Sequence, residues 1–183
     1  MKVTIDLNLP YIEFTAADMK SIGNDAIALI KERTQEGLDV NDKPFESYST
    51  KPTYISKSSK TAKGLSPKGG RKTESGKSVF YQGGYSQYKK ASSGSSKVDL
   101  TLSGNMMQSL VVKDASNKSF TIGIKGPAEK YAYEVNDDRE FIGLSKEDSD
   151  TITEIVQQMI MDKTKWAEAY FHQYKRSLIW SKL

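Results

Sequence analysis

The sequence predicts an α+β fold, in which a small antiparallel sheet packs against two long helices and carries a long Ser/Lys/Gly-rich basic loop or arm. Three observations support this: short segments with alternating apolar residues, two long segments with apolar residues at helical spacing, and a polar insert between them. We expect one α+β domain over residues 1–183, with 49–97 as a long flexible insert and 164–183 as a C-terminal helical extension.

The first strand and the first long helix follow one another at the start of the chain. Apolar and polar residues alternate over residues 2–8, and Pro10 interrupts the pattern, which predicts a strand. Thr15 can cap a helix that runs to about Arg33 with one apolar face, and Gly37 is available to end it.

Residues 97–112 predict a strand, one helical turn and a second strand. Alternation over 98–103 indicates the first strand, and Gly104 and Asn105 supply turn and N-cap chemistry. Val111 and Val112 favour extended structure again, because β-branched side chains are restricted in helices. Residues 119–125 alternate too, so the two segments are expected to pair as a hairpin.

Two helices are predicted after this hairpin. Pro127 can open a short helix that runs through Tyr133. We expect this helix to be broken by residues 136–138. Ser145 begins the second long helix, and acidic residues near its start suit the helix dipole. Its apolar residues form one stripe, at Ile152, Ile155, Val156, Met159 and Ile160.

The insert is the most polar and most basic part of the chain. The net charge is +4, but residues 51–97 hold eleven Lys or Arg and one acid, which leaves the remainder at −6. This composition predicts a mobile arm, or alternatively a long solvated loop within the folded domain. Aromatic residues among the cations could stack on nucleobases or bury against another subunit; they are Tyr54, Phe80, Tyr81, Tyr85 and Tyr88.

Catalytic, metal and membrane functions find little support in the sequence. There is no cysteine, and the single histidine, His172, lies in an aromatic segment away from any nucleophile motif. The GKS letters at 76–78 lack the earlier glycine of a phosphate loop, because Arg71 occupies that position. We therefore expect no enzyme activity, no cofactor, no metal and no membrane partner.

Four phrases, in this order, carry a resemblance to a known family. They are RTQEGLDVNDKPFESYS at 33–49, VDLTLSGNMMQSLVV at 98–112, FTIGI at 120–124 and REFIGLSKEDSDTI at 139–152. The sequence resembles the virion-morphogenesis or tail-completion family of tailed bacteriophages, which contains neck proteins that join head to tail. It departs from the family phrase at Asn41 and Asp42, where a glycine is usual.

The resemblance implies a structural protein of the virion neck, present in the host cytoplasm during assembly. It implies a homo-oligomeric ring, a hexamer or a dodecamer, that contacts other neck, connector, tail-tube or terminator proteins, and it allows non-specific contact with packaged DNA. The expected contact residues lie in the insert and in the C-terminal helix: Lys57, Lys60, Lys63, Lys68, Arg71, Lys72, Lys77, Phe80, Tyr81, Tyr85, Tyr88, Trp166, Tyr170, Tyr174 and Trp180.

The alternative is a nucleic-acid-binding protein that uses the basic, aromatic segment 51–97. In this reading the cations neutralise phosphates and the aromatic rings stack on bases. The sequence has no helix-turn-helix, RNA-recognition or zinc-finger signature, and the charge of −6 on the remainder opposes non-specific binding.

Overall fold

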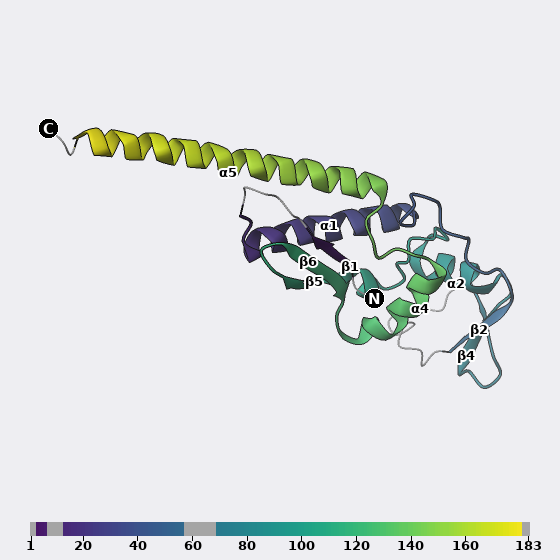
Figure 1. Cartoon of the computed structure of the whole chain (residues 1–183). Coiled ribbons are helices and arrows are strands. Elements are labelled where there is room, and N and C mark those ends of the chain that lie inside the picture. Colours follow the sequence, from purple (N-terminus) through teal and green to yellow (C-terminus); the bar gives the residue numbers. More distant parts are fainter. Residues whose placement is uncertain (1–2, 7–12, 57–68, 181–183) are drawn as a thin grey trace.

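A computed structural model describes residues 3–6, 13–56 and 69–180, and its α+β fold confirms the predicted class. The described residues contain five α-helices and two small antiparallel sheets. The larger body holds the first sheet and the two long helices, and the insert forms the second sheet at the opposite end from the C-terminus (Figure 1).

The main sheet has the strand order β1-β6-β5 and consists of β1 (Val3–Asp6), β5 (Leu110–Ala115) and β6 (Ser119–Ile124). Both neighbouring pairs are antiparallel, which confirms the predicted hairpin of β5 and β6. Helix α1 (Ala16–Glu36) covers one face of this sheet. It approaches closely at Gly23, where an added Cβ would lie 2.7 Å from a methyl group of Val112.

The ends of α1 follow the predicted capping chemistry. The hydroxyl of Thr15 accepts a hydrogen bond from the amide of Asp18, and the Asp18 carboxylate accepts one from the amide of Thr15, which makes a capping box. Gly37 ends the helix in the left-handed conformation, at a φ of 89°. Thr15 and Gly37 are the two ends that the sequence predicts for this helix, so its bounds are confirmed to within a few residues.

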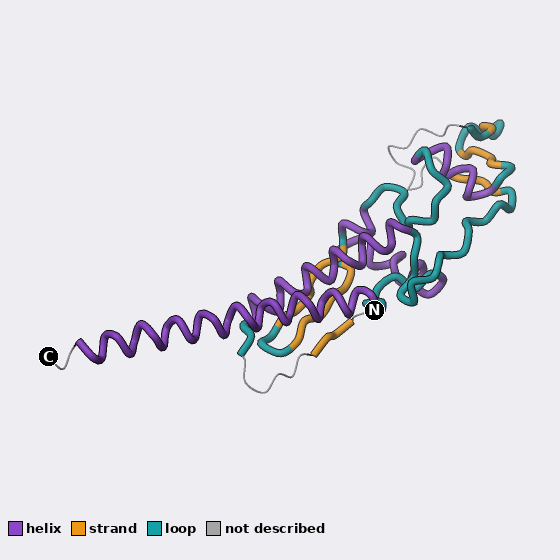
Figure 2. The backbone as a smooth tube through the Cα atoms, turned by 90° about the horizontal axis from the view of Figure 1, so that it is seen from above, coloured by secondary structure: helices purple, strands orange, loops and turns teal. Residues whose placement is uncertain are grey.

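Helix α5 (Lys146–Trp180) packs against α1 over its first half. Ile152 and Val156 are buried, and Ile155, Met159 and Ile160 are partly buried against the same core, which confirms the predicted stripe. The helix then continues without a break to Trp180 and extends well past the sheet and α1 (Figures 1 and 2).

The insert contains regular structure, which corrects the expectation of an arm without it. Strands β2 (Thr53–Ser56), β3 (Arg71–Lys72) and β4 (Ser78–Tyr81) form a sheet in the order β2-β4-β3. Helix α2 (Gly84–Ser93) packs on it. Val79, Tyr81 and Tyr88 make a second small core, so aromatic side chains here supply the buried surface that the overall composition lacks.

The strand predicted at 98–103 is wrong. The Asp99 carboxylate accepts a hydrogen bond from the amide of Thr101 at 2.9 Å, and Leu100 has a φ of 50°, so the backbone turns instead of extending. The alternating apolar residues nevertheless point into the fold, because Leu100 packs on the main core and Leu102 on the core of the insert.

The short helices that follow are of the predicted type, but one of them ends at a different residue from the one predicted. Helix α3 (Asn105–Gln108) is the expected single turn before β5. A 3₁₀ turn (Gly126–Ala128) contains Pro127 and leads into α4 (Glu129–Asp138), which runs through 136–138 instead of breaking there. The side chain of Asn136 accepts hydrogen bonds from the amides of Phe141 and Ile142, so this residue organises the following turn from within the helix.

Candidate binding cleft

A candidate site lies in a cleft of about 630 Å³ between the insert and the main body. The insert contributes β2, α2 and the residues before β2, while the body contributes the segment 100–106, α4 and Arg139. The lining is mainly aromatic and aliphatic, as is usual for binding sites.

Three tyrosines form a packed row along the insert wall of the cleft. The rings of Tyr48 and Tyr85 lie edge to face, with centroids 5.0 Å apart, and the rings of Tyr85 and Tyr88 are 5.7 Å apart. Tyr88 in turn contacts Tyr81 of the insert core, at 5.3 Å. Edge-to-face packing of this kind holds the rings in fixed orientations, so the wall is preformed.

Arg139 supplies the positive charge at the cleft. Its guanidinium carbon lies 5.5 Å from the centre of the Tyr48 ring, and one terminal nitrogen donates to the backbone oxygen of Glu46 at 3.4 Å. Its Nε is buried and has no hydrogen-bond partner among the described residues. The cleft therefore places a cation beside an aromatic wall.

Burial favours the protonated form of three tyrosines of the cleft. Burial raises the pKa of Tyr48 to about 12, with a smaller upward effect from Tyr85. Burial also raises the pKa of Tyr85 and that of Tyr88. The described lining is mainly aromatic and aliphatic, so the cleft is suited to holding apolar and aromatic groups.

A buried lysine fastens the insert to the body beside this cleft. Lys89 of α2 is only 1% exposed, and its Nζ lies 3.0 Å from the carboxylate of Asp99. The same amine donates to the hydroxyl of Ser93 at 3.0 Å. Because Asp99 belongs to the segment that leads into α3, this ion pair ties α2 to the main body.

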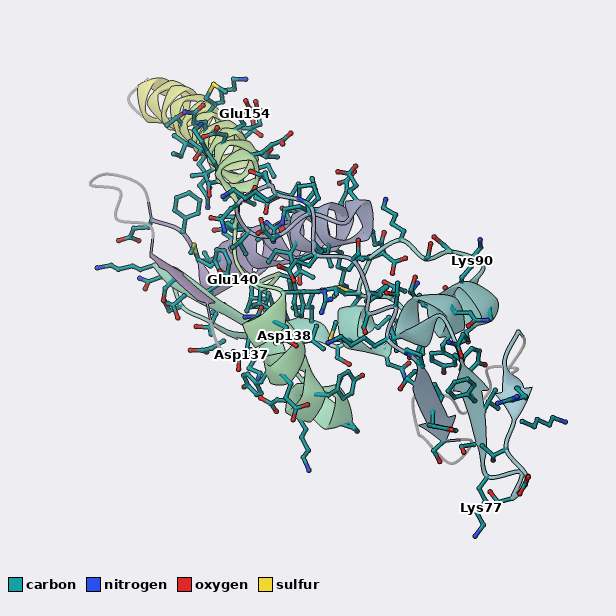
Figure 3. All side chains as sticks on the ribbon, turned by 90° about the vertical axis from the view of Figure 1, so that its right-hand side faces the viewer. Lys77, Lys90, Asp137, Asp138, Glu140 and Glu154 are labelled. Atoms are coloured by element: carbon teal, nitrogen blue, oxygen red, sulfur yellow. The ribbon has the colours of Figure 1, made fainter. Side chains whose placement is uncertain are left out.

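Three of the charged residues predicted for partner contact lie on one hairpin of the insert. Arg71 and Lys72 of β3 are exposed, and Lys77 is exposed in the turn before β4, where Figure 3 shows it at the tip of the hairpin. The Arg71 guanidinium carbon lies 5.6 Å from the ring centre of Phe80, which is partly buried. This hairpin is thus a basic, partly aromatic surface, and the Phe80 ring connects it to the cleft, because it lies 4.9 Å from the ring of Tyr54 in the cleft lining.

The aromatic residues predicted for partner contact differ in how deeply the structure buries them. Tyr81 and Tyr88 are 0% and 3% exposed and pack in the core of the insert. Tyr81 is therefore buried within its own chain, contrary to the prediction of partner contact, whereas Tyr88 also lines the cleft. Tyr85 is half-buried in the cleft wall. Four predicted lysines lie outside the described residues, namely Lys57, Lys60, Lys63 and Lys68. Four aromatic residues belong to α5, whose backbone is described there without side-chain positions: Trp166, Tyr170, Tyr174 and Trp180.

Sequence reasoning missed the residues that complete the cleft from outside the insert. Tyr48, Tyr131 and Arg139 were given no role, because they lie in three segments that only the fold brings together. Tyr48 and Arg139 both fall in phrases that carry the family resemblance, which was the one available signal.

Comparison of the chain with protein families, with curated proteins and with solved structures found no match. Among the described residues, no group of three or more His, Cys, Asp or Glu side chains is placed to hold a metal ion. The helices within the described ranges include none that is long and apolar enough to cross a bilayer.

Proposed function

We propose that this protein is a structural subunit of a phage neck ring, which joins the portal side of the capsid to the tail and has no enzymatic activity. The ordered phrases that resemble the tail-completion family motivate the proposal. The observation that carries it is the second half of α5, which extends beyond the body that its first half packs against (Figures 1 and 2).

The last described ion pair between α5 and the body marks where the extension begins. The amine of Lys163 lies 2.8 Å from the Asp18 carboxylate at the start of α1. The segment beyond it contains Trp166, Tyr170, Tyr174 and Trp180, an unusual density of aromatic residues, and so of apolar side-chain surface, for one helical segment. Burial against a neighbouring subunit would remove this apolar surface from water.

A closed ring requires that one surface of each subunit contact a different surface of the next. The tyrosine cleft is an apolar surface lined partly by β2 and α2, and Figure 1 shows these two elements at the end of the molecule opposite the C-terminus. We propose that the extension of α5 and the insert end supply the two halves of this contact. The charged hairpin of the insert remains for other neck or tail proteins, with packaged DNA as a further contact.

The test compares the full chain with a variant that carries Trp166→Ser, Tyr170→Ser and Tyr174→Ser. Light scattering during size exclusion should give a ring mass, a hexamer or a dodecamer, for the full chain and a monomer mass for the variant. The control carries Glu168→Ser and Lys175→Ser at other positions of the same helical segment and should keep the ring. Equal masses for all three proteins would contradict the proposed role of α5.

The second candidate function is nucleic-acid binding, and the exposed hairpin of Arg71, Lys72 and Lys77 is the observation that favours it. The burial of Tyr81 and Tyr88 removes two of the rings that this reading needs for stacking. Titration of duplex and single-stranded DNA at rising salt separates the candidates. Binding that weakens steeply with salt and is lost in Lys72→Ala/Lys77→Ala supports the nucleic-acid reading, whereas indifference to DNA supports protein partners alone.

A further inference from the structure

A second groove, of about 760 Å³, runs between α1 and the outer edge of β5. One wall is a stripe of α1 that includes Lys20, Ile27 and Lys31. The other wall is formed by four consecutive residues, 110–113, of β5. This groove shares no lining residue with the tyrosine cleft.

The groove follows the edge of the strand and not one of its faces. Val112 points toward α1, where it would meet a Cβ at Gly23, and successive strand side chains point to opposite faces. Val111 nevertheless lines the same groove as Val112. Val111 and Val112 point to opposite faces of the sheet, so they can both line one groove only where it passes along the edge of β5. Among the described strands β5 pairs with β6 alone, so the groove lies at the unpaired edge.

An unpaired edge presents backbone amide and carbonyl groups that can pair with another extended chain. Beneath it, the buried side chains of Ile27 and Leu110 provide an apolar floor. The groove therefore offers the two elements of strand addition, which are a hydrogen-bonding edge and a surface for alternate side chains.

The positive charge of the groove lining indicates which charge a bound segment should carry. Lys20, Lys31, Lys113 and Lys125 line the groove, and no carboxylate does. Lys113 pairs with Glu129 at 2.6 Å, whereas the other three lysines have no ion pair among the described residues. An extended segment that carries Asp or Glu would neutralise these cations.

We propose that an acidic, extended segment of a partner protein binds here by adding as a strand to β5. A symmetric pairing of two β5 edges is a poor alternative, because it would bring the same lysines together from both sides. This inference does not depend on the proposed function, since it rests on the edge, the floor and the charge of the groove alone.

The probe is a fluorescein-labelled peptide of alternating Val and Glu, with a Val and Lys peptide of the same length as its control. Fluorescence anisotropy should detect binding of the acidic peptide only, and added salt should weaken it. Lys20→Glu/Lys31→Glu should reduce the affinity at least about tenfold, because two attractive contacts become repulsive. Lys90→Glu, at an exposed position of α2 outside the groove, should leave the affinity unchanged, and circular dichroism confirms that each variant is folded.

N-methylated peptides distinguish strand addition from charge attraction alone. One peptide is methylated at its odd residues and one at its even residues. Strand addition requires that one of the two lose binding, because only alternate amides face the neighbouring strand. Equal affinities for both, no binding of the parent peptide, or a dimer that the peptide dissociates in light scattering would each overturn the proposal.

Discussion

Arg33 of α1 and Asp148 of α5 form an ion pair in the interior of the main body, where both side chains are less than a tenth exposed. Arg33 also donates hydrogen bonds to the backbone oxygens of Phe141 and Gly143, at 2.8 and 3.0 Å. Asp148 accepts one from the amide of Ser145, whose hydroxyl accepts one from the amide of Asp148. One ion pair therefore joins both long helices and the turn between α4 and α5.

Removal of the Asp148 charge should strongly destabilise the main body. Asp148→Asn leaves the Arg33 guanidinium buried without its counter-charge, which costs about 3–5 kcal/mol of unfolding free energy. Urea denaturation followed by circular dichroism measures the loss. Asp150→Asn is the matched control on the same helix turn, because its ion pair with Lys146 is exposed and should matter little. Similar losses of unfolding free energy in the two variants would contradict a larger contribution from the buried ion pair than from the exposed one.

The ion pair between Lys89 and Asp99 should hold the insert against the body. Asp99→Asn keeps the Lys89 amine buried but removes its counter-charge, so the unfolding free energy should fall by about 2 kcal/mol. Lys89→Met should cost less when it is added to Asp99→Asn than when it is made alone, because the pair is already broken. Independent, additive losses in this double-mutant cycle would contradict a direct interaction.

Two glycines of the insert should respond differently to the same substitution. Gly84 has a φ of 65°, and an added Cβ would lie 2.4 Å from the backbone oxygen of Lys51. Gly84→Ala should thus displace α2 from the chain before β2 and disrupt the cleft. Gly94 also has a positive φ, of 78°, but nothing lies within 4 Å of an added Cβ.

Gly94→Ala should accordingly lower the free energy of unfolding by only about 1–2 kcal/mol, the strain of placing alanine in the left-handed conformation. Near-UV circular dichroism reports the packing of the aromatic residues, which include Tyr48, Tyr85 and Tyr88 of the cleft wall. The signal should change in Gly84→Ala and persist in Gly94→Ala. Loss of the signal in both variants would contradict the steric explanation.

The contact between Asp18 and Lys163 should make stability depend on acid pH. The hydrogen bond from Lys163, with one from the Thr15 amide, lowers the pKa of Asp18 from 3.8 to about 2. Because the folded-state pKa lies below the unfolded value, the stabilisation is fully present above about pH 4 and is lost as the pH falls toward 2.

The carboxylate is partly exposed, so solvent screening limits this stabilisation to about 1 kcal/mol. Urea denaturation of Asp18→Asn against the unchanged protein should give this difference at pH 6, and the difference should shrink as the pH falls from 4. A difference that is constant over this range would exclude titration of Asp18 as its source.

Sequence patterns predicted those elements whose determinants are local. The cap at Thr15, the end at Gly37 and the apolar stripe of α5 are all set by residues within a few turns of one another. The hairpin of β5 and β6 was likewise predictable from alternation and a short polar turn.

The insert and the cleft depend on contacts between distant segments. Tyr81 and Tyr88 were interpreted as exposed because their neighbours are Ser, Gly and Lys, yet they pack on Val79 and on each other. In the same way, the alternation over 98–103 reflects contacts with two different cores and not membership of a sheet. Composition averages over a segment cannot show which few side chains meet.

The length of α5 has a consequence for how the protein moves through solution. Its 35 residues span about 52 Å at 1.5 Å per residue, and the second half extends from a small body (Figure 1). Such a shape raises the frictional coefficient and the Stokes radius above those of a sphere of the same mass. A monomer will therefore elute from a size-exclusion column earlier than a globular standard of the same mass. It will also sediment more slowly than that standard, because its shape is elongated.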